Sequence, residues 1–362
     1  MAVNWRLALP VIISVFFATR ILTILLAVFV ETIQPAGPAL SWDTRPVLTS
    51  LTGFDAIYYL GIAAEGYHLQ PVVDDFPDWV FFPGYPAVTR LVSVVTLGDI
   101  AVAGVLVANV ALLGALIVLF ALTRRYLDHE SASRTVTYIT VAPGAVAFGM
   151  AYSDSLFLLV SAGAFLAAEH RRWRWMAFLL GAATLTRLPG ALLVIPLAVL
   201  LWKRDVKAWM PWCGLLVAPI ALAGLGLYQN AVLGDPTAFL TGQEHWNFAP
   251  RSGGDGGPMG TAPMSPVAPL LTFVLAVYLF LFVYARVDRI PLPYLVVGAL
   301  AVLLSLGSLR LLSVARYLAV AWPFSWLAAG RDPPWLRAVW PIASTGLFML
   351  FAVLHFTEAM AP

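Results

Sequence analysis

Long apolar runs dominate the pattern of hydrophobic and polar positions along this chain. Runs near 20 residues recur over its whole length, separated by short polar or aromatic segments. About 20 apolar residues make one helical membrane span, and in lipid a helix satisfies its own backbone polar groups. The pattern therefore predicts about eleven spans, with the pair 88–97 and 100–122 counted as one broken or re-entrant crossing: 7–30, 88–97 with 100–122, 135–150, 155–169, 176–188, 190–202, 209–231, 266–285, 291–307, 314–329 and 338–356.

Composition supports a membrane protein. Of the 362 residues, 61% are hydrophobic and 11% are charged, and the mean hydropathy is +0.86. A soluble domain carries about a quarter charged residues. No internal repeat or separate soluble domain is visible, so we expect one all-α transmembrane domain over 1–362. The first run, Leu7 to Val30, is too long for a signal-peptide core and lacks a small-residue cleavage site, so we interpret it as a retained span.

The basic residues predict the orientation in the membrane. If the N-terminus is cytoplasmic, 14 of the 21 Lys and Arg residues fall on the cytoplasmic side, as the positive-inside rule requires. They lie in short clusters between spans, which does not favour nucleic-acid binding. The 14 are Arg6, Arg124, Arg125, Arg134, Arg171, Arg172, Arg174, Lys203, Arg204, Lys207, Arg286, Arg289, Arg331 and Arg337.

The loops on the two sides differ in kind. The predicted cytoplasmic loops are short and basic, whereas two long loops, roughly 31–87 and 232–265, lie on the other side. Long loops held by a rigid scaffold usually carry function. We therefore expect the active surface to face away from the cytoplasm.

Metal and redox chemistry find little support in the sequence. Cys213 is the only cysteine, which excludes an intramolecular disulfide and a thiol pair. The five histidines, at 68, 129, 170, 245 and 355, show no metal-ligand spacing, and the acidic run at 74, 75 and 78 is typical of a solvated segment. We expect no metal and no cofactor.

The strongest local signal is the segment from Phe54 to Tyr67, F-D-A-I-Y-Y-L-G-I-A-A-E-G-Y. Its apolar positions follow one helix face, with Asp55 in the first turn and Gly66 at the end. The helix is too short to span and is expected in the interface plane. Asp55 then lies between water and lipid, where a lipid-borne donor meets a polar acceptor. A simple helix-capping aspartate is equally compatible with this spacing.

The segment Trp79 to Pro86 contains F-F-P-G-Y-P, in which two prolines exclude a regular helix. Such backbone at membrane depth is tolerated only against protein or a wet cavity. A cavity wall is one interpretation, and an aromatic interfacial belt is the other.

Several charged residues lie at the outer ends of predicted spans. Asp154, in A-Y-S-D-S, is a second acid or a turn residue, and Arg187 lies in the tight turn T-R-L-P-G. Arg310 and Arg316 lie near the outer end of a late span. An arginine there is costly unless it snorkels or is paired. Several of them on the side that the positive-inside rule disfavours favour a binding site for a lipid phosphate.

The second long loop contains Q-E-H-W-N-F at 243–248. Its polar and aromatic side chains, among them Glu244 and Trp246, suit stacking on sugars and hydrogen bonding to them. An ordinary interfacial loop has the same composition.

Taken in order, four blocks resemble motifs of the PIG-V mannosyltransferase family, in the GT-C class of membrane glycosyltransferases. They are F-D-A-I-Y-Y-L-G-I-A-A-E-G-Y, F-F-P-G-Y-P, Y-S-D-S-L-F and T-R-L-P-G, covering roughly 54–190. The second half matches mainly by hydropathy, with Glu244-His245-Trp246 and a late Arg316-Tyr317. Phe54, Gly84 and Asp154 stand where Trp, Leu and Glu are usual, as in a distant, prokaryotic member.

The resemblance implies a GT-C-like fold and an inverting sugar transfer from a polyprenyl-phosphate donor to a lipid or glycolipid acceptor, with mannose as the expected sugar. Asp55 matches the catalytic base. A phosphate leaving group needs no general acid, so one base and a cationic clamp suffice. Arg187 or Arg316 would hold the departing phosphate, and Asp154 and Glu244 would orient the acceptor.

Further substrate contacts are expected from four aromatic side chains and one arginine: Tyr58, Tyr59, Tyr85, Trp246 and Arg310. The implied location is the plasma membrane of a prokaryote, with an extracytoplasmic active site in contact with membrane lipids.

Two other functions stay open. A lipid-linked sugar transporter or flippase also has many spans and embedded arginines, although transporters often show internal repeats. A membrane acyltransferase or ligase would rely on a histidine, for which His68 and His245 are the outer-loop candidates.

Overall fold

Helices make up all the named regular elements in the part of the chain that the computed structural model describes. That part comprises residues 3–34, 41–70, 76–248, 272, 274–277, 290–307, 314–329 and 334–357. The only β-type pairing there is an isolated bridge between Ser41 and Gly53.

The first half of the chain contains ten elements, two of them 3-10 helices (η): α1 (Trp5–Ile33), α2 (Leu48–Leu51), α3 (Asp55–Glu65), η1 (Asp78–Val80), α4 (Gly84–Ser93), α5 (Ile100–Thr123), α6 (His129–Thr140), η2 (Ala145–Gly149), α7 (Asp154–Glu169) and α8 (Trp173–Thr186). The second half contains α9 (Pro189–Leu192), α10 (Val194–Lys203), α11 (Trp209–Gly214), α12 (Val217–Leu233), α13 (Ala238–Phe248), α15 (Leu292–Gly307), α16 (Val314–Ala319), α17 (Pro323–Ala329) and α18 (Pro334–Phe356).

Within the described residues, four helical segments are long and apolar enough to cross a membrane: Trp5–Ile33, Ile100–Thr123, Trp209–Leu233 and Arg337–Phe356. They correspond to the predicted spans 7–30, 100–122, 209–231 and 338–356. The all-helical prediction is thereby confirmed for the described residues. Helices α7, α8, α10 and α15 coincide with other predicted spans but are shorter than 18 residues.

Two predicted continuous spans are broken. The span 135–150 was expected to be one helix, but α6 ends at Thr140 and is followed by a turn and η2. Pro143 and Gly144 cause the break, because proline cannot continue the helical hydrogen bonding. The span 314–329 divides into α16 and α17, with Pro323 at the start of the second helix. Most of the predicted span 266–285 lies outside the described residues.

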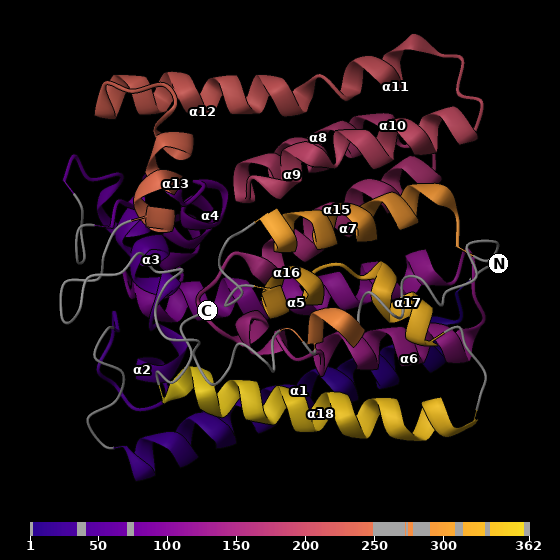
Figure 1. The fold of residues 1–362 in the computed structure, drawn as a ribbon, viewed down its shortest axis with the longest axis horizontal. Coiled ribbons are helices and arrows are strands. Elements are labelled where there is room, and N and C mark those ends of the chain that lie inside the picture. Colours follow the sequence, from indigo (N-terminus) through magenta and orange to yellow (C-terminus); the bar gives the residue numbers. More distant parts are fainter. Residues whose placement is uncertain are drawn as a thin grey trace.

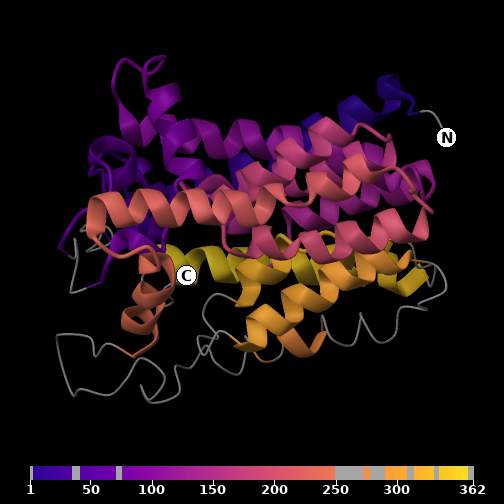
Figure 2. The ribbon, with the colours of Figure 1, turned by 90° about the horizontal axis from the view of Figure 1, so that it is seen from above.

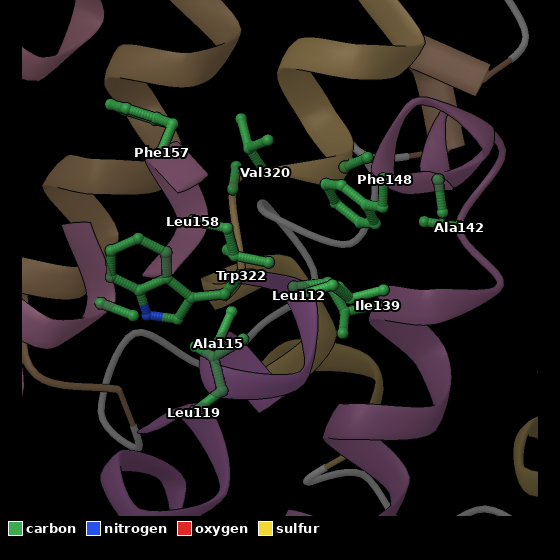
Figure 3. Close-up of a cluster of buried hydrophobic side chains, with 14 of the residues drawn as sticks. Leu112, Ala115, Leu119, Ile139, Ala142, Phe148, Phe157, Leu158, Val320 and Trp322 are labelled. Carbon is green, nitrogen blue, oxygen red and sulfur yellow. The ribbon is translucent and has the colours of Figure 1, made fainter. Parts of the chain in front are cut away.

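The core lies where α5 and α7 pack against each other along the centre of the bundle. Figure 3 shows aliphatic side chains of α5 meeting Phe148 of η2, Leu158 of α7 and Trp322 of the α16–α17 link. These side chains are fully or almost fully buried. Each buried aromatic ring contributes a few kcal/mol of packing energy, so α7 is fixed in a dense environment on several sides.

The long helices run along the longest axis of the molecule (Figure 1), and several of the short helices lie at one end of it. Both views place α2, α3, α4 and α13 at that end, which we call the site end (Figures 1 and 2). The opposite end carries the α5–α6, α7–α8 and α10–α11 links. The basic clusters of those links therefore lie far from α3.

Candidate functional site

Helix α3 begins at Asp55 and ends at Glu65, as the sequence pattern predicts. Gly66 follows with a φ of 92°, a positive value that glycine adopts without steric cost. Phe54, before the helix, also has a positive φ, of 55°. That conformation is unfavourable for an aromatic residue, so surrounding contacts must hold the chain in this shape just before Asp55.

Four charged side chains predicted from separate motifs meet at the site end. Arg316 donates from Nη1 to Asp55 Oδ2 (2.6 Å) and from Nη2 to Asp154 Oδ2 (2.9 Å). Arg187 donates from Nη1 to Asp154 Oδ1. The four groups come from the start of α3, the start of α7, the end of α8 and the middle of α16. We call them the outer cluster.

Burial differs sharply within the outer cluster. The side chain of Asp154 is fully buried, and those of Arg316 and Arg187 are 7% and 10% exposed. Asp55 is 20% exposed. Two cations and two anions balance, which keeps charge tolerable in a low-dielectric interior. Among the described residues, no hydrogen bond engages Asp55 Oδ1, so this acid has an oxygen available to a substrate.

Aromatic rings lie against both arginines. The Arg316 guanidinium carbon lies 4.5 Å from the ring centre of Tyr152, and that of Arg187 lies 5.3 Å from the ring centre of Tyr317. Cation–π contacts of this kind gain strength where water is excluded. They leave the guanidinium edges to the carboxylates and fix both planes. Neither tyrosine was a predicted site residue, although Tyr152 lies within the Y-S-D-S-L-F block and Tyr317 directly follows Arg316.

The three predicted tyrosines lie in the same region, and their expected substrate contacts stay predictions. Tyr58 stacks on Phe81 with ring centres 4.8 Å apart. The Tyr59 hydroxyl lies 2.7 Å from Ser153 Oγ, and the Tyr85 hydroxyl donates to the Gly104 carbonyl at 2.7 Å. The hydroxyls of Tyr59 and Tyr85 are thus used in packing α3 and α4 onto the bundle.

The F-F-P-G-Y-P and T-R-L-P-G motifs come close together at Gly84 of the first motif. A Cβ on Gly84 would lie 2.7 Å from the Leu185 carbonyl oxygen. Only glycine allows α4 to begin this close to the chain that leads into Arg187. Gly144 plays the same part for Arg316, because its Cβ would lie 2.6 Å from the Arg316 backbone nitrogen. Both arginine positions therefore depend on a close backbone approach.

An apolar cavity of about 40 Å³ adjoins the outer cluster. Its walls come from α7, α9, α15 and the α16 region, and include Phe157, Leu193, Val297 and Leu304. Arg187 is its only charged lining residue among those described. A cavity that joins an arginine to aliphatic walls suits an amphiphile with an anionic head.

Three predicted residues contribute less to the described geometry. Glu244 and Trp246 lie in α13, which packs against η1 and α12, but their side chains are outside the described part of the molecule. Arg310 is outside it altogether. Within the described residues, no three His, Cys, Asp or Glu side chains lie close enough to hold a metal ion.

Comparison with known proteins finds both sequence and fold relatives. No family model matches the chain. It is 29% identical over 164 residues to GPI mannosyltransferase 2 from Cryptococcus neoformans var. neoformans serotype D. The match covers 42% of this chain and 34% of the relative, so the chain spans only about a third of the length of that curated protein.

The fold resembles those of two solved structures. ArnT from Cupriavidus metallidurans, solved with undecaprenyl phosphate bound, aligns with a TM-score of 0.54 at 15% identity, over 96% of this chain and 76% of ArnT. The Archaeoglobus fulgidus oligosaccharyltransferase, solved with a tethered acceptor peptide, aligns with a TM-score of 0.51 at 14% identity, over 97% and 56% of the two chains.

These findings confirm the resemblance that the four sequence blocks indicate. The chain is similar in sequence to a GPI mannosyltransferase of the PIG-V type, and its fold is similar to those of two GT-C enzymes, ArnT and the archaeal oligosaccharyltransferase.

Proposed function

We propose that this protein is an inverting glycosyltransferase that moves mannose from a polyprenyl-phosphate donor to a hydroxyl of a lipid or glycolipid, on the non-cytoplasmic face of the membrane. One observation carries the proposal. Asp55 presents a carboxylate whose Oδ2 is held by buried Arg316 and whose Oδ1 makes no hydrogen bond within the described residues. A fixed, partly exposed carboxylate of this kind is suited to general-base catalysis.

The proposed reaction requires no general acid. The acceptor oxygen attacks the anomeric carbon, the bond from that carbon to the phosphate oxygen breaks, and polyprenyl phosphate leaves with the electron pair. Asp55 takes the hydroxyl proton through Oδ1. A phosphate monoester is a stable leaving group and needs charge stabilisation rather than a proton. Asp154 serves by holding Arg187 and Arg316 in place.

The donor position follows from Arg187 and the apolar cavity. One face of Arg187 is engaged by Asp154, and the side chain also lines the cavity. A phosphate at Arg187 would let the first prenyl units enter between α7 and α15. The undecaprenyl phosphate in the ArnT structure supports a donor of this class, and the GPI mannosyltransferase relative supports mannose and a lipid acceptor.

The direction of the reaction in the membrane rests on charge. The links at the opposite end carry Arg124, Arg125, Arg171 and Arg172, and such clusters stay on the cytoplasmic side. The site end then faces away from the cytoplasm. A lipid-linked sugar donor can reach a site on that face because the donor lies within the membrane itself.

The test uses purified protein in detergent or vesicles with polyprenyl-phosphate mannose and a mixture of lipid acceptors. Asp55→Asn keeps the size of the side chain and removes the base, so we expect transfer to fall about 10²- to 10⁴-fold. Asp43→Asn, which alters a half-buried loop aspartate paired with Arg45, is the matched control and should transfer normally.

Two results would contradict the proposal. Equal transfer by wild type and Asp55→Asn would remove Asp55 as the base. An absence of transfer to every acceptor, together with lipid translocation in vesicles, would replace sugar transfer by transport.

A further inference from the structure

His355 lies in the last turn of α18 and is 2% exposed. It is the histidine farthest along the chain, and no motif predicts a role for it. Its ring centre is 4.7 Å from that of Phe54, and its Nε2 is 3.5 Å from the Tyr152 hydroxyl. A buried imidazole therefore contacts the residue that precedes Asp55 and the ring that supports Arg316.

The hydrogen bonds determine which nitrogen of His355 carries the proton. The Tyr152 hydroxyl has one hydrogen, and it donates to the Gly53 carbonyl at 3.3 Å. In the long contact with His355 the hydroxyl must then accept, so the hydrogen is on Nε2. His355, Tyr152 and Gly53 thus form a directed chain that ends on the backbone two residues before Asp55.

Packing provides a second route from His355 to the same acid. Phe54 has a positive φ of 55°, which costs of order 1–3 kcal/mol for a residue other than glycine. It persists only if neighbouring groups hold the ring, and the imidazole lies against it in a tilted arrangement. Releasing this contact would allow Phe54 to relax and to move the first turn of α3.

The third contact is through Arg316. The Tyr152 ring lies under its guanidinium at 4.5 Å, and the same guanidinium holds Asp55 Oδ2 at 2.6 Å. We propose that His355 is a positioning residue for Asp55: it touches no substrate, and it holds the carboxylate by bracing Phe54 and Tyr152. The role in catalysis rests on the proposed function; the role in placing Asp55 does not.

The kinetic experiment compares substitutions that separate the two contacts. His355→Phe keeps a ring against Phe54 and loses the Nε2–H donor, whereas His355→Gln keeps an N–H donor and loses the ring. We expect kcat of each to fall roughly tenfold, because small displacements of a reacting group cost that much or more, while the donor and acceptor KM stay within about twofold. His129→Phe, at a second histidine packed on a phenylalanine, is the matched control and should leave kcat unchanged.

Tyr152→Phe guards against a fold defect in the histidine variants. It removes only the hydroxyl that accepts from His355, and the double variant with His355→Phe should be no slower than the slower single variant, since both act on one chain of contacts. Two results would overturn the proposal. One is a double variant whose fold loss in kcat equals the product of the two single losses, and the other is an unchanged kcat in His355→Phe.

A measurement without substrate separates this inference from the proposed function. Carbodiimide modification of Asp55, followed by peptide mass spectrometry, should be about twofold faster or more in His355→Phe than in wild type, because a loosened carboxylate is more accessible. Asp43 in the same molecules is the internal reference. If Asp55 is modified faster in His355→Phe but the protein transfers no sugar, the proposed transferase activity is refuted and the positioning role is retained. Unchanged modification would refute the positioning role even if transfer is observed.

Discussion

The two ends of α7 carry buried carboxylates in similar company and to different effect. Asp154 begins the helix and Glu169 ends it, and the side chains of both are fully buried. Each is paired with two arginines. The comparison is informative because helix, burial and partner type are the same, so differences in function must come from the remaining contacts.

At the opposite end, all the donors serve one acid. Glu169 accepts hydrogen bonds from the hydroxyls of Tyr126 and Tyr294, and from Arg204 at 2.6 Å. Its arginines reach solvent, with Arg125 and Arg204 32% and 48% exposed. Both carboxylate oxygens are used, and the contacts connect α7 to α15 and to two links. These contacts join helices together and leave neither carboxylate oxygen of Glu169 available for chemistry.

At the site end, the same composition includes a second acid. Asp55 shares Arg316 with Asp154, remains partly exposed, and adjoins the Arg187-lined cavity. Here Asp154 occupies the position that Glu169 has at the other end, and Asp55 is the surplus group. On the proposed function, a buried ion pair in this protein takes part in chemistry where one of its carboxylates keeps an oxygen without a hydrogen bond among the described residues.

The largest expected contrast comes from exchanging arginine for lysine at each end. Arg316→Lys replaces the two forked nitrogens that reach Asp55 and Asp154 by one ammonium on a shorter side chain, so we expect kcat to fall about a hundredfold or more. Arg204→Lys at the opposite end should leave kcat near the wild-type value. Steady-state transfer assays on both variants measure this. Equal losses would show that the two ends are not functionally distinct.

Glu169→Gln tests the structural side of the comparison. It removes charge-assisted hydrogen bonds from a buried site, while its arginines can turn to water. We expect a loss of about 2 kcal/mol in the free energy of unfolding, seen as a lower melting temperature in detergent. Transfer per folded molecule should be unchanged. A loss of turnover as severe as in Arg316→Lys would contradict a purely structural role.

Arg20 in α1 provides a third case, because it belongs neither to the outer cluster nor to the group of residues around Glu169. It is 7% exposed, and none of its three guanidinium nitrogens has a hydrogen-bond partner among the described residues. An uncompensated buried charge destabilises a protein. Arg20→Met keeps an unbranched side chain and should raise stability by about 1 kcal/mol, measured by thermal unfolding, with transfer unaltered. A raised donor KM would instead indicate that Arg20 contacts the bound anion.

The smallest effect is expected at His68, in the first long loop. Its ring lies 3.0 Å from Glu65 and 2.9 Å from Asp78. The hydrogen bond to Glu65, and then that to Asp78, raises the pKa of His68 above 6.5. Because the folded state favours the protonated form, this stabilisation is complete below pH 6.5 and is lost as pH rises through the raised pKa.

His68→Asn should therefore lower the melting temperature more at pH 6 than at pH 9. The difference should stay under about 1 kcal/mol, because the ring is 30% exposed and Glu65 is 69% exposed. The same shift at both pH values would show that the loss comes from packing and not from charge.

The apolar helices and the four charged residues of the outer cluster could be predicted from the sequence. Asp55, Asp154, Arg187 and Arg316 were each found from a motif or from an arginine at the end of a span. Their pairing could not be predicted, because Arg316 is 261 residues from Asp55 and 162 from Asp154. Hydropathy places residues at a depth in the membrane and does not specify which of them meet.

The missed residues are those whose role depends on tertiary contacts alone. Tyr152 lies beside Asp154, where adjacency offered a weak signal, whereas His355 lies 203 residues further along the chain. Glu169 looked like the end of an ordinary span. The breaks after Thr140 and before Pro323 were marked by prolines, but uniform hydrophobicity on both sides of each break favoured a continuous helix.

The length of α7 links the site to the membrane around it. Sixteen residues give a helix of about 24 Å, whereas the hydrocarbon layer is about 30 Å thick. The headgroup planes therefore cannot meet both ends of α7 unless the bilayer thins locally. We therefore expect acyl-chain length to affect the proposed transfer, with short-chain lipids bringing a headgroup level with Asp55 and long-chain lipids holding it above the acid.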